Sequence, residues 1–208
     1  MGGDIEGLAT LIRRYEADAL RLAYLLTGDR FLAEDIAQDS FIQADRALSH
    51  FDTRRPFLPW FQRIVTNTAR MRLRSARRRR EVSLTTLASE HGDEDGLRRE
   101  PLAAFFDGQA PLEPAARAER LEERAAIGAA LSELTAKQRE AVALRYYFAY
   151  SDQEIATILD CSVNTARHRV YDGLHALERV IRQRYPWLIE SEDGMSEPIK
   201  RGKGVESR

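Results

Sequence analysis

Residues 151–170 read SDQEIATILDCSVNTARHRV and contain two helix starts separated by a short turn. Ser151 and Glu154 have the spacing of a capping box, in which each side chain bonds the backbone N–H of the other residue. Apolar residues then recur at helical spacing up to Leu159, and Ser162 can cap a second, longer helix. A short helix, a three-residue turn and a longer helix predict a helix-turn-helix, whose second helix lies in the DNA major groove.

The outer face of that second helix carries side chains suited to reading DNA. If Val163, Ala166 and Val170 face the core, the polar residues between them face outward. Arginine can pair with guanine edges, asparagine with adenine, and threonine with phosphate or a thymine methyl. The alternative is an ordinary helical hairpin with a solvated polar face, and we favour DNA binding. The predicted contacts are Ser162, Asn164, Thr165, Arg167, His168, Arg169 and Tyr171.

Helical periodicity also runs through the residues before this motif, and strand alternation is nearly absent. Thr135 and Gln138 form another capping-box pair, which opens a helix ahead of the motif. Together with a helix that begins near residue 115, these elements predict a helical domain over residues 115–188. Beyond it almost no core-forming residue remains, so we predict a disordered tail over residues 189–208.

The N-terminal part predicts another small helical domain. Apolar residues at helical spacing mark helices over residues 5–26 and about 32–48. Pro59 suits the first turn of a third helix, because its missing N–H would be unpaired there anyway. Three such helices can share one core, which predicts a domain over residues 5–80. Residues 81–114 lose the periodicity and hold glycines, prolines and many acids, so we predict a flexible acidic linker in an all-α, two-domain protein.

Charge is segregated along the chain, although the formal net charge is only −1. Residues 54–80 contain ten arginines and no acid, whereas the segments on both sides of this block are acidic. Uniform mixing would predict a solvated surface. The segregation instead predicts that one face binds a polyanion through phosphate contacts while other faces meet a different partner.

The composition also excludes several classes of function. The apolar stretches fall far short of the roughly 20 residues that a membrane span needs, and no basic segment precedes an apolar core at the N-terminus. The single cysteine, Cys161, rules out an intramolecular disulfide and a cysteine-based zinc site, which fits a cytoplasmic protein. The four histidines lack metal-binding spacing, and phosphate-loop and nucleophile-elbow motifs are missing. We therefore predict a protein that is not an enzyme and needs no metal or cofactor.

Three further stretches carry a resemblance to a known family. Residues 131–169, from LSELTAKQREAVALRY through the motif quoted above, resemble region 4 of extracytoplasmic-function (ECF) sigma factors of the sigma-70 family. GDRFLAEDIAQDSF at residues 28–41 resembles the region 2 helix that grips core RNA polymerase, and WFQRIVTN at residues 60–67 resembles the promoter-melting helix. The resemblance implies an alternative sigma factor, which directs core polymerase to specific promoters and initiates transcription.

The family also implies partners and contact residues. Its region 2 binds the β′ clamp helices and reads the −10 promoter element, and its region 4 docks on the β flap and reads the −35 element; an anti-sigma factor is a further implied partner. The implied polymerase contacts are Glu34, Asp35, Gln38, Asp39 and Phe41. The implied contacts to the −10 element and to phosphates are Arg54, Arg55, Arg63, Asn67, Arg70, Arg74, Arg77 and Arg78. Arg70 departs from the family, in which an acidic residue is usual, and Asp160 stands where many relatives have glycine.

Two other classes of function remain as alternatives. A stand-alone helix-turn-helix regulator would bind duplex DNA tightly without polymerase. A sigma-like module that only titrates an anti-sigma factor should lack the basic third helix, which this chain has in abundance.

Overall fold

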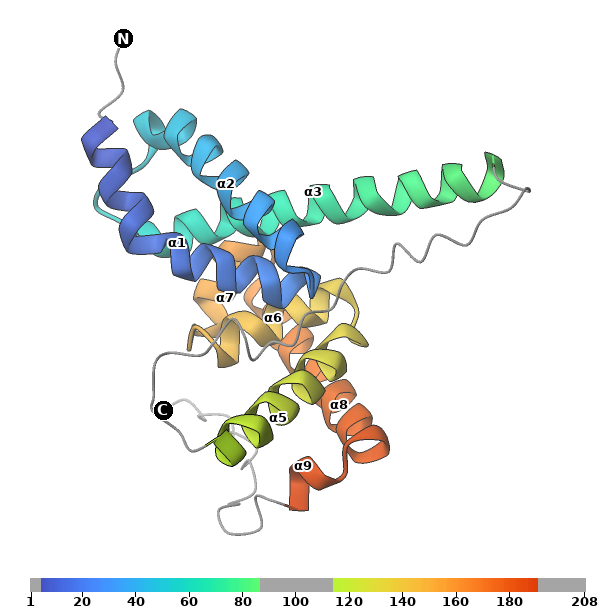
Figure 1. Ribbon diagram of the computed structural model, residues 1–208. Helices are drawn as coiled ribbons and strands as arrows, with labels where there is room; N and C mark the ends of the chain where they lie inside the picture. The colour runs from blue at the N-terminus through green and yellow to red at the C-terminus, as the bar shows by residue number, and fades with distance from the viewer. Residues whose placement is uncertain (1–4, 87–113, 191–208) are drawn as a thin grey trace, which may run out of the picture.

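The computed structural model describes residues 5–86 and 114–190, and every regular element in these two ranges is a helix (Figure 1). An N-terminal domain contains α1 (Ile5–Thr27), α2 (Arg30–Ala47), the short 3-10 helix η1 (Leu48–His50) and α3 (Phe57–Thr86). A C-terminal domain contains α5 (Pro114–Ser132), α6 (Ala136–Tyr146), α7 (Asp152–Leu159), α8 (Val163–Arg184) and α9 (Trp187–Glu190). The predicted all-α fold of two small helical domains is confirmed.

Local signals in the sequence account for the helix ends of the N-terminal domain. Gly28 ends α1 with a positive φ of 71°, a conformation that costs glycine little because it has no Cβ. The side chain of Asp29 then caps α2 by accepting from the backbone N–H of Leu32 at 3.0 Å. α3 turns Phe61 and Val65, both fully buried, toward the core that it shares with α1 and α2.

The C-terminal domain is fixed by the caps that the sequence predicts. Both capping boxes are present, Thr135 with Gln138 on α6 and Ser151 with Glu154 on α7. Their side chains satisfy backbone N–H groups that the first turn of a helix leaves unpaired. The two hydrogen bonds from Ser151 also lower the pKa of Glu154, because they stabilise its charged form.

The ends of the predicted linker and tail differ slightly from the observed helices. α3 continues to Thr86, six residues past the predicted end of the domain at residue 80. α9 ends at Glu190, just past the predicted end of the domain at residue 188. The rest of the predicted linker, residues 87–113, and the tail from residue 191 lie outside the described residues.

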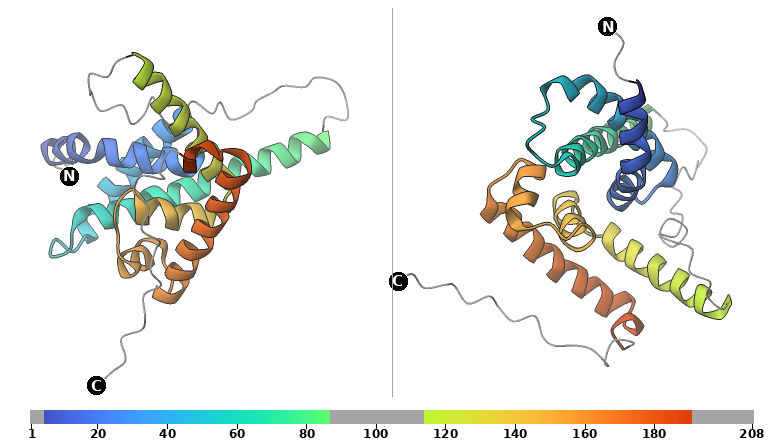
Figure 2. Two further views of the ribbon diagram at one scale, coloured as in Figure 1. Left: turned by 90° about the horizontal axis from the view of Figure 1, so that it is seen from below. Right: turned by 90° about the vertical axis from the view of Figure 1, so that its left-hand side faces the viewer.

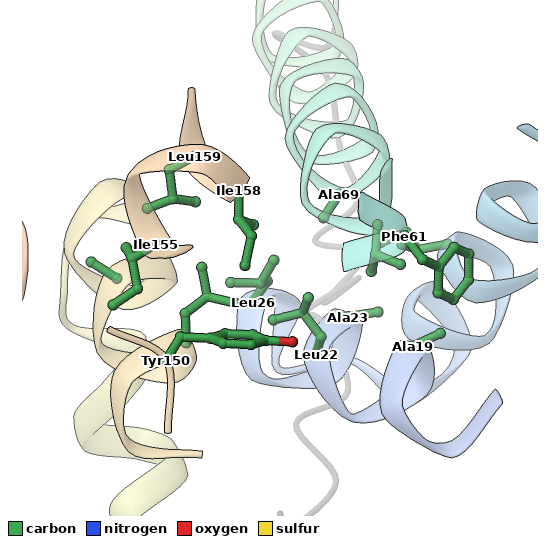
Figure 3. Close-up of a cluster of buried hydrophobic side chains, with 14 of the residues drawn as sticks. Ala19, Leu22, Ala23, Leu26, Phe61, Ala69, Tyr150, Ile155, Ile158 and Leu159 are labelled. Atoms are coloured by element: carbon green, nitrogen blue, oxygen red, sulfur yellow. The ribbon is translucent and has the colours of Figure 1, made fainter. Parts of the chain in front are cut away.

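The two domains are packed against each other around one continuous apolar core, which the periodicity of the sequence did not predict. Tyr150 and Ile158 of the C-terminal domain lie opposite Leu22 of α1 in Figure 3, and all three are buried. The contacts between domains join α3 to α7 and α1 to α5 and α6, and an ion pair joins α3 to α6. The later turns of α3 project away from the other helices (Figures 1 and 2). No helix within the described residues is long and apolar enough to cross a membrane.

Candidate nucleic-acid interface

The helix-turn-helix of the C-terminal domain consists of α7, a tight turn and α8. Asp160 ends α7 in the left-handed conformation, with φ 54° and ψ 58°, which aspartate tolerates better than most residues. Ser162 then caps α8, because its Oγ accepts from the backbone N–H of Thr165 at 3.1 Å. The positive end of the α8 dipole therefore lies at the start of the predicted DNA-reading helix.

The predicted reading face of α8 is mostly open to solvent. Ala166 and Val170 are buried in the domain, whereas the predicted contacts between them point outward. Tyr171 is 56% exposed, and its ring meets His175 edge-on at 4.3 Å between centroids. Among the predicted contacts, Ser162, Asn164, Arg167, His168 and Tyr171 are exposed, and Thr165 and Arg169 are partly buried.

The side chain of Arg167 on this face is held by a hydrogen bond to a neighbouring helix. Its Nε donates to Oδ2 of Asp152 on α7 at 3.0 Å, and its side chain is still 65% exposed. The other oxygen of Asp152 accepts from Arg145 of α6. One carboxylate therefore joins arginines from two different helices.

Part of the predicted basic surface of the N-terminal domain is also exposed. Arg74, Arg77 and Arg78 are exposed on α3, and the first two line a cavity between α3 and α6. In the loop before α3, Arg54 donates through its side chain and its backbone N–H to Asp52, and these hydrogen bonds lower the pKa of that carboxyl. Arg55 lies 3.8 Å from the same carboxylate. The pairs are exposed, so they contribute little to stability and leave these arginines available to phosphates.

Other predicted DNA contacts on α3 are instead engaged by the C-terminal domain. Arg70 donates from Nε and Nη2 to the two oxygens of Glu140 at 2.7 and 2.6 Å. This bidentate pair raises the pKa of Arg70 and keeps the guanidinium charged. Arg63 lies 3.3 Å from Asp160, and Asn67 is exposed beside Arg70. The structure thus divides the predicted −10 contacts into an exposed group and a group at the domain boundary.

The face of α3 that carries Arg70 also contains buried polar groups without partners. Gln62, Thr66 and Arg70 follow at intervals of four residues and so share one helix face. Gln62 and Thr66 are fully buried, and within residues 5–86 and 114–190 neither the amide of Gln62 nor the hydroxyl of Thr66 has a hydrogen-bond partner. Each such group costs roughly 1–3 kcal/mol. This chemistry is unusual for a permanent core and typical of a surface that also meets water or a polar ligand.

A groove between α1 and α2, with a volume of about 620 Å³, is lined by three of the predicted polymerase contacts, Glu34, Gln38 and Phe41. Glu34 and Gln38 are exposed at its side, and the exposed acids Glu16 and Asp45 also line it, so acidic residues border an apolar floor. Asp35 is exposed on α2 but does not line the groove. Asp39 is paired with Arg72 of α3. Phe41 also lines the groove, although it is only 7% exposed and its ring centroid lies 4.6 Å from that of Phe61.

The sequence did not single out two charged residues of α6. Arg139 donates to the carbonyls of Leu26 at 2.8 Å and Leu131 at 2.9 Å, and so binds the C-terminal ends of α1 and α5 at once. Glu140 is 3% exposed. A signal existed for Glu140, because it lies four residues before the buried Leu144 on the apolar face, where a charge needs a partner. Arg139 gave no such signal.

Within residues 5–86 and 114–190, no group of three or more histidine, cysteine or acidic side chains could hold a metal ion. The residues described above form charged and hydrogen-bonding surfaces. These surfaces can bind phosphate, base edges and protein helices.

Comparisons with known proteins match both domains. Residues 11–79 match the family described as Sigma-70 region 2, and residues 124–177 match Sigma-70, region 4. The RNA polymerase sigma-H factor of Pseudomonas aeruginosa is 30% identical over 184 residues, which cover 86% of this chain and 89% of that protein. The ECF RNA polymerase sigma factor SigW of Bacillus subtilis is 31% identical over 180 residues, covering 86% and 91%.

A solved structure has a similar fold. The sigma factor RpoE of Bartonella quintana, solved in complex with the anti-sigma factor NepR, superposes with a TM-score of 0.60. The match covers 87% of this chain and 98% of that one at 22% identity. At 22% identity this similarity shows the fold alone.

Proposed function

This chain belongs to the ECF group of the sigma-70 family, and from that membership we infer that it is an alternative sigma factor, which directs core RNA polymerase to specific promoters and initiates transcription there. The observation that supports this function is the presence of two separate exposed polar and basic surfaces on two domains in the order of the family, and we propose that both bind DNA. One is the exposed face of α8, and the other is the arginine-rich length of α3.

We propose a different role for each surface. The exposed side chains of α8 read base edges of the −35 element in the major groove, led by Asn164 and Arg167. Arg74, Arg77 and Arg78 bind phosphates near the −10 element, which gives affinity without reading sequence. Arg63, Asn67 and Arg70 complete this second surface once the C-terminal domain has moved off α3.

Core polymerase binds the groove between α1 and α2 in this proposal. Its acidic rim of Glu16, Glu34 and Asp45 suits basic residues on a partner helix, and the apolar floor supplies the buried contact area. Phe41 supports the floor from below, since it is nearly buried against Phe61. The C-terminal domain contacts the β flap.

An anti-sigma factor is the expected regulatory partner, as in the solved complex of the Bartonella relative. The protein carries out no chemistry of its own, needs no cofactor, and acts in the cytoplasm, where the polymerase is. A stand-alone regulator would not need the acidic groove on α2, and a purely titrating module would not need the exposed arginines of α3.

Run-off transcription tests the function directly. The full chain is added to purified bacterial core polymerase on DNA from upstream of its own gene, and a specific transcript should appear only when the chain is present. If no transcript forms and the chain alone binds duplex DNA tightly, it is a stand-alone regulator instead.

The role of α3 has its own test. Replacing Arg74, Arg77 and Arg78 by alanine should weaken promoter complexes and flatten their salt dependence, by about 0.9 in the log–log slope for each phosphate that is no longer bound. Core binding should be unchanged. Arg13→Ala on α1 is the control, and an unaltered slope in the triple variant would rule out phosphate binding by α3.

A further inference from the structure

We propose that Asp152 is a positioning residue for DNA reading: it holds the guanidinium of Arg167 in the orientation that reads one base pair of the −35 element. The proposal rests on the proposed function, because it assumes that the face of α8 meets promoter DNA. It goes beyond that function by assigning specificity to a residue of α7, outside the reading helix.

Asp152, Arg145 and Arg167 come from three helices and form a bonded group, called the Asp152 clamp below. Asp152 is the first residue of α7, Arg145 lies in the last turn of α6, and Arg167 lies in the second turn of α8. Oδ2 of Asp152 accepts from Nε of Arg167 at 3.0 Å, and Oδ1 accepts from Arg145. Because each carboxylate oxygen serves one arginine, Arg145 fixes the carboxylate and the carboxylate fixes Arg167.

The clamp leaves the reading edge of Arg167 free. A guanidinium is planar and has five N–H donors, and only the one on Nε is used by Asp152. The Nη groups have no hydrogen-bond partner within residues 5–86 and 114–190, and 65% of the side chain is exposed. Specific recognition of guanine uses a pair of N–H donors directed at O6 and N7. Anchoring Nε therefore sets the plane and direction of the donors that remain.

Holding Arg167 in one orientation before DNA binds should also raise its affinity for the correct base pair. An unrestrained arginine loses much of its rotamer freedom when it binds, and ordering a side chain of this kind costs about two- to tenfold in affinity. Asp152 imposes that order before DNA arrives. The correct base pair gains the full benefit, whereas a wrong base pair does not, because its acceptors do not match the fixed donors.

The charges at the clamp remain favourable for DNA. Asp152 would repel phosphates on its own, but two arginines surround it and the cluster is net positive. Asp152 is 22% exposed in its side chain, so it lies behind Arg167 rather than in front of it. Its ordinary role would be that of an acid in the first turn of a helix, which stabilises α7 through the helix dipole. That role alone predicts a change in stability and no change in base preference.

The experiment measures base preference with the complete complex. Full-length chain and core polymerase are assembled on a promoter library randomised across the −35 element, and bound sequences are counted for the parent, Asp152→Asn, Arg167→Ala and the double variant. Asp172→Asn is the matched control, because Asp172 is an exposed acid on α8 that takes no part in the clamp. Thermal unfolding of each variant is recorded alongside.

We expect Arg167→Ala to remove preference at one base pair and Asp152→Asn to reduce it by about two- to tenfold at that same base pair. Binding to unrelated DNA should hold or rise in Asp152→Asn and in Asp172→Asn, since each loses a negative charge. The double variant should match Arg167→Ala, because Asp152 acts through Arg167.

The outcomes separate the possible failures. If Arg167→Ala removes a preference that Asp152→Asn leaves intact, the clamp is refuted and the sigma function stands. Loss of preference at every position together with a lowered melting temperature in Asp152→Asn also refutes it, in favour of a purely structural acid. If the parent forms no promoter complex with core polymerase, the proposed function itself has failed.

Discussion

Replacing Glu140 by glutamine should loosen the contact between the two domains. Glu140 is 3% exposed and binds Arg70 through both oxygens, at 2.7 and 2.6 Å. The substitution preserves shape and removes the charge and one acceptor. Since the pair connects α6 to α3, its free energy contributes to docking of the domains rather than to the fold of either one.

The magnitude follows from how far each partner is buried. Removing one partner of a fully buried ion pair costs about 3–5 kcal/mol. Arg70 is 28% exposed in its side chain and borders a cavity of about 320 Å³ between α3 and α6, so water can replace part of the interaction. We therefore expect a loss of about 2 kcal/mol in the free energy of docking. This changes the ratio of docked to undocked molecules by about 30-fold.

Single-molecule energy transfer can measure this ratio. Dyes are attached to cysteines introduced at Thr53 and Gln183, one exposed site on each domain, after Cys161 has been replaced by serine. Glu140→Gln should raise the fraction of molecules with low energy-transfer efficiency, in which the domains are undocked, and Arg70→Gln should act in the same direction. Far-UV circular dichroism should remain as in the parent.

The control removes a comparable charge away from the boundary. Glu178 pairs with Arg182 on α8 at 3.0 Å, and both side chains are more than half exposed. Glu178→Gln should change stability by less than about 0.5 kcal/mol. Identical transfer distributions for Glu140→Gln and Glu178→Gln would refute the assignment of docking free energy to the Arg70 pair.

Three further predictions concern stability. Gly173→Ala should lower the free energy of unfolding by about 1–2 kcal/mol, because the new Cβ would lie 2.6 Å from Cγ2 of Val142 across the contact between α6 and α8. Chemical denaturation measures this free energy, and an unchanged denaturation midpoint would contradict the prediction. Ala149→Gly should stabilise the protein by up to about 1 kcal/mol, since Ala149 has a φ of 56°; a lower melting temperature would count against this. Burial raises the pKa of Tyr150 to about 12, so between about pH 10 and 12 the unfolded chain releases the phenol proton while the folded protein keeps it. The parent should therefore lose stability relative to Tyr150→Phe across this range, and parallel profiles of unfolding free energy against pH would disprove this.

Most of the fold could be predicted from the sequence because its signals are local. The two capping boxes and the Ser162 cap depend on residues three positions apart, and all three are present in the structure. The outward direction of Asn164 and Arg167 follows from the same periodicity that buries Ala166. The boundary of α3 was less well predicted, since a helix that projects past the core needs no apolar stripe in its last turns.

The contacts between domains could not be predicted, because they join residues distant in the sequence. Arg70 was predicted to bind phosphate, and a guanidinium that suits phosphate equally suits a carboxylate such as Glu140, 70 positions later. For a similar reason the sequence indicates only a helix start at Asp152. Its bond to Arg167 depends on the crossing of α7 and α8, which a linear pattern does not encode.

The chemistry of the domain boundary indicates a docking surface rather than a fixed core. Ile158 and Leu159 bring apolar area to α1 and α3, which favours closure. Against this, the side chains of Gln62 and Thr66 are buried without hydrogen bonds to the part of the chain that the structure describes. Each penalty of roughly 1–3 kcal/mol disappears when water reaches the surface. Arg63 and Asp160 add little, because their side chains are 44% and 78% exposed. The polar contacts that favour closure are therefore the Arg70 pair and the hydrogen bond from Arg139 to the carbonyl of Leu26. Of these, the Arg70 pair is the one that DNA could replace, because a phosphate could take the place of its carboxylate partner without loss of a charge-assisted hydrogen bond.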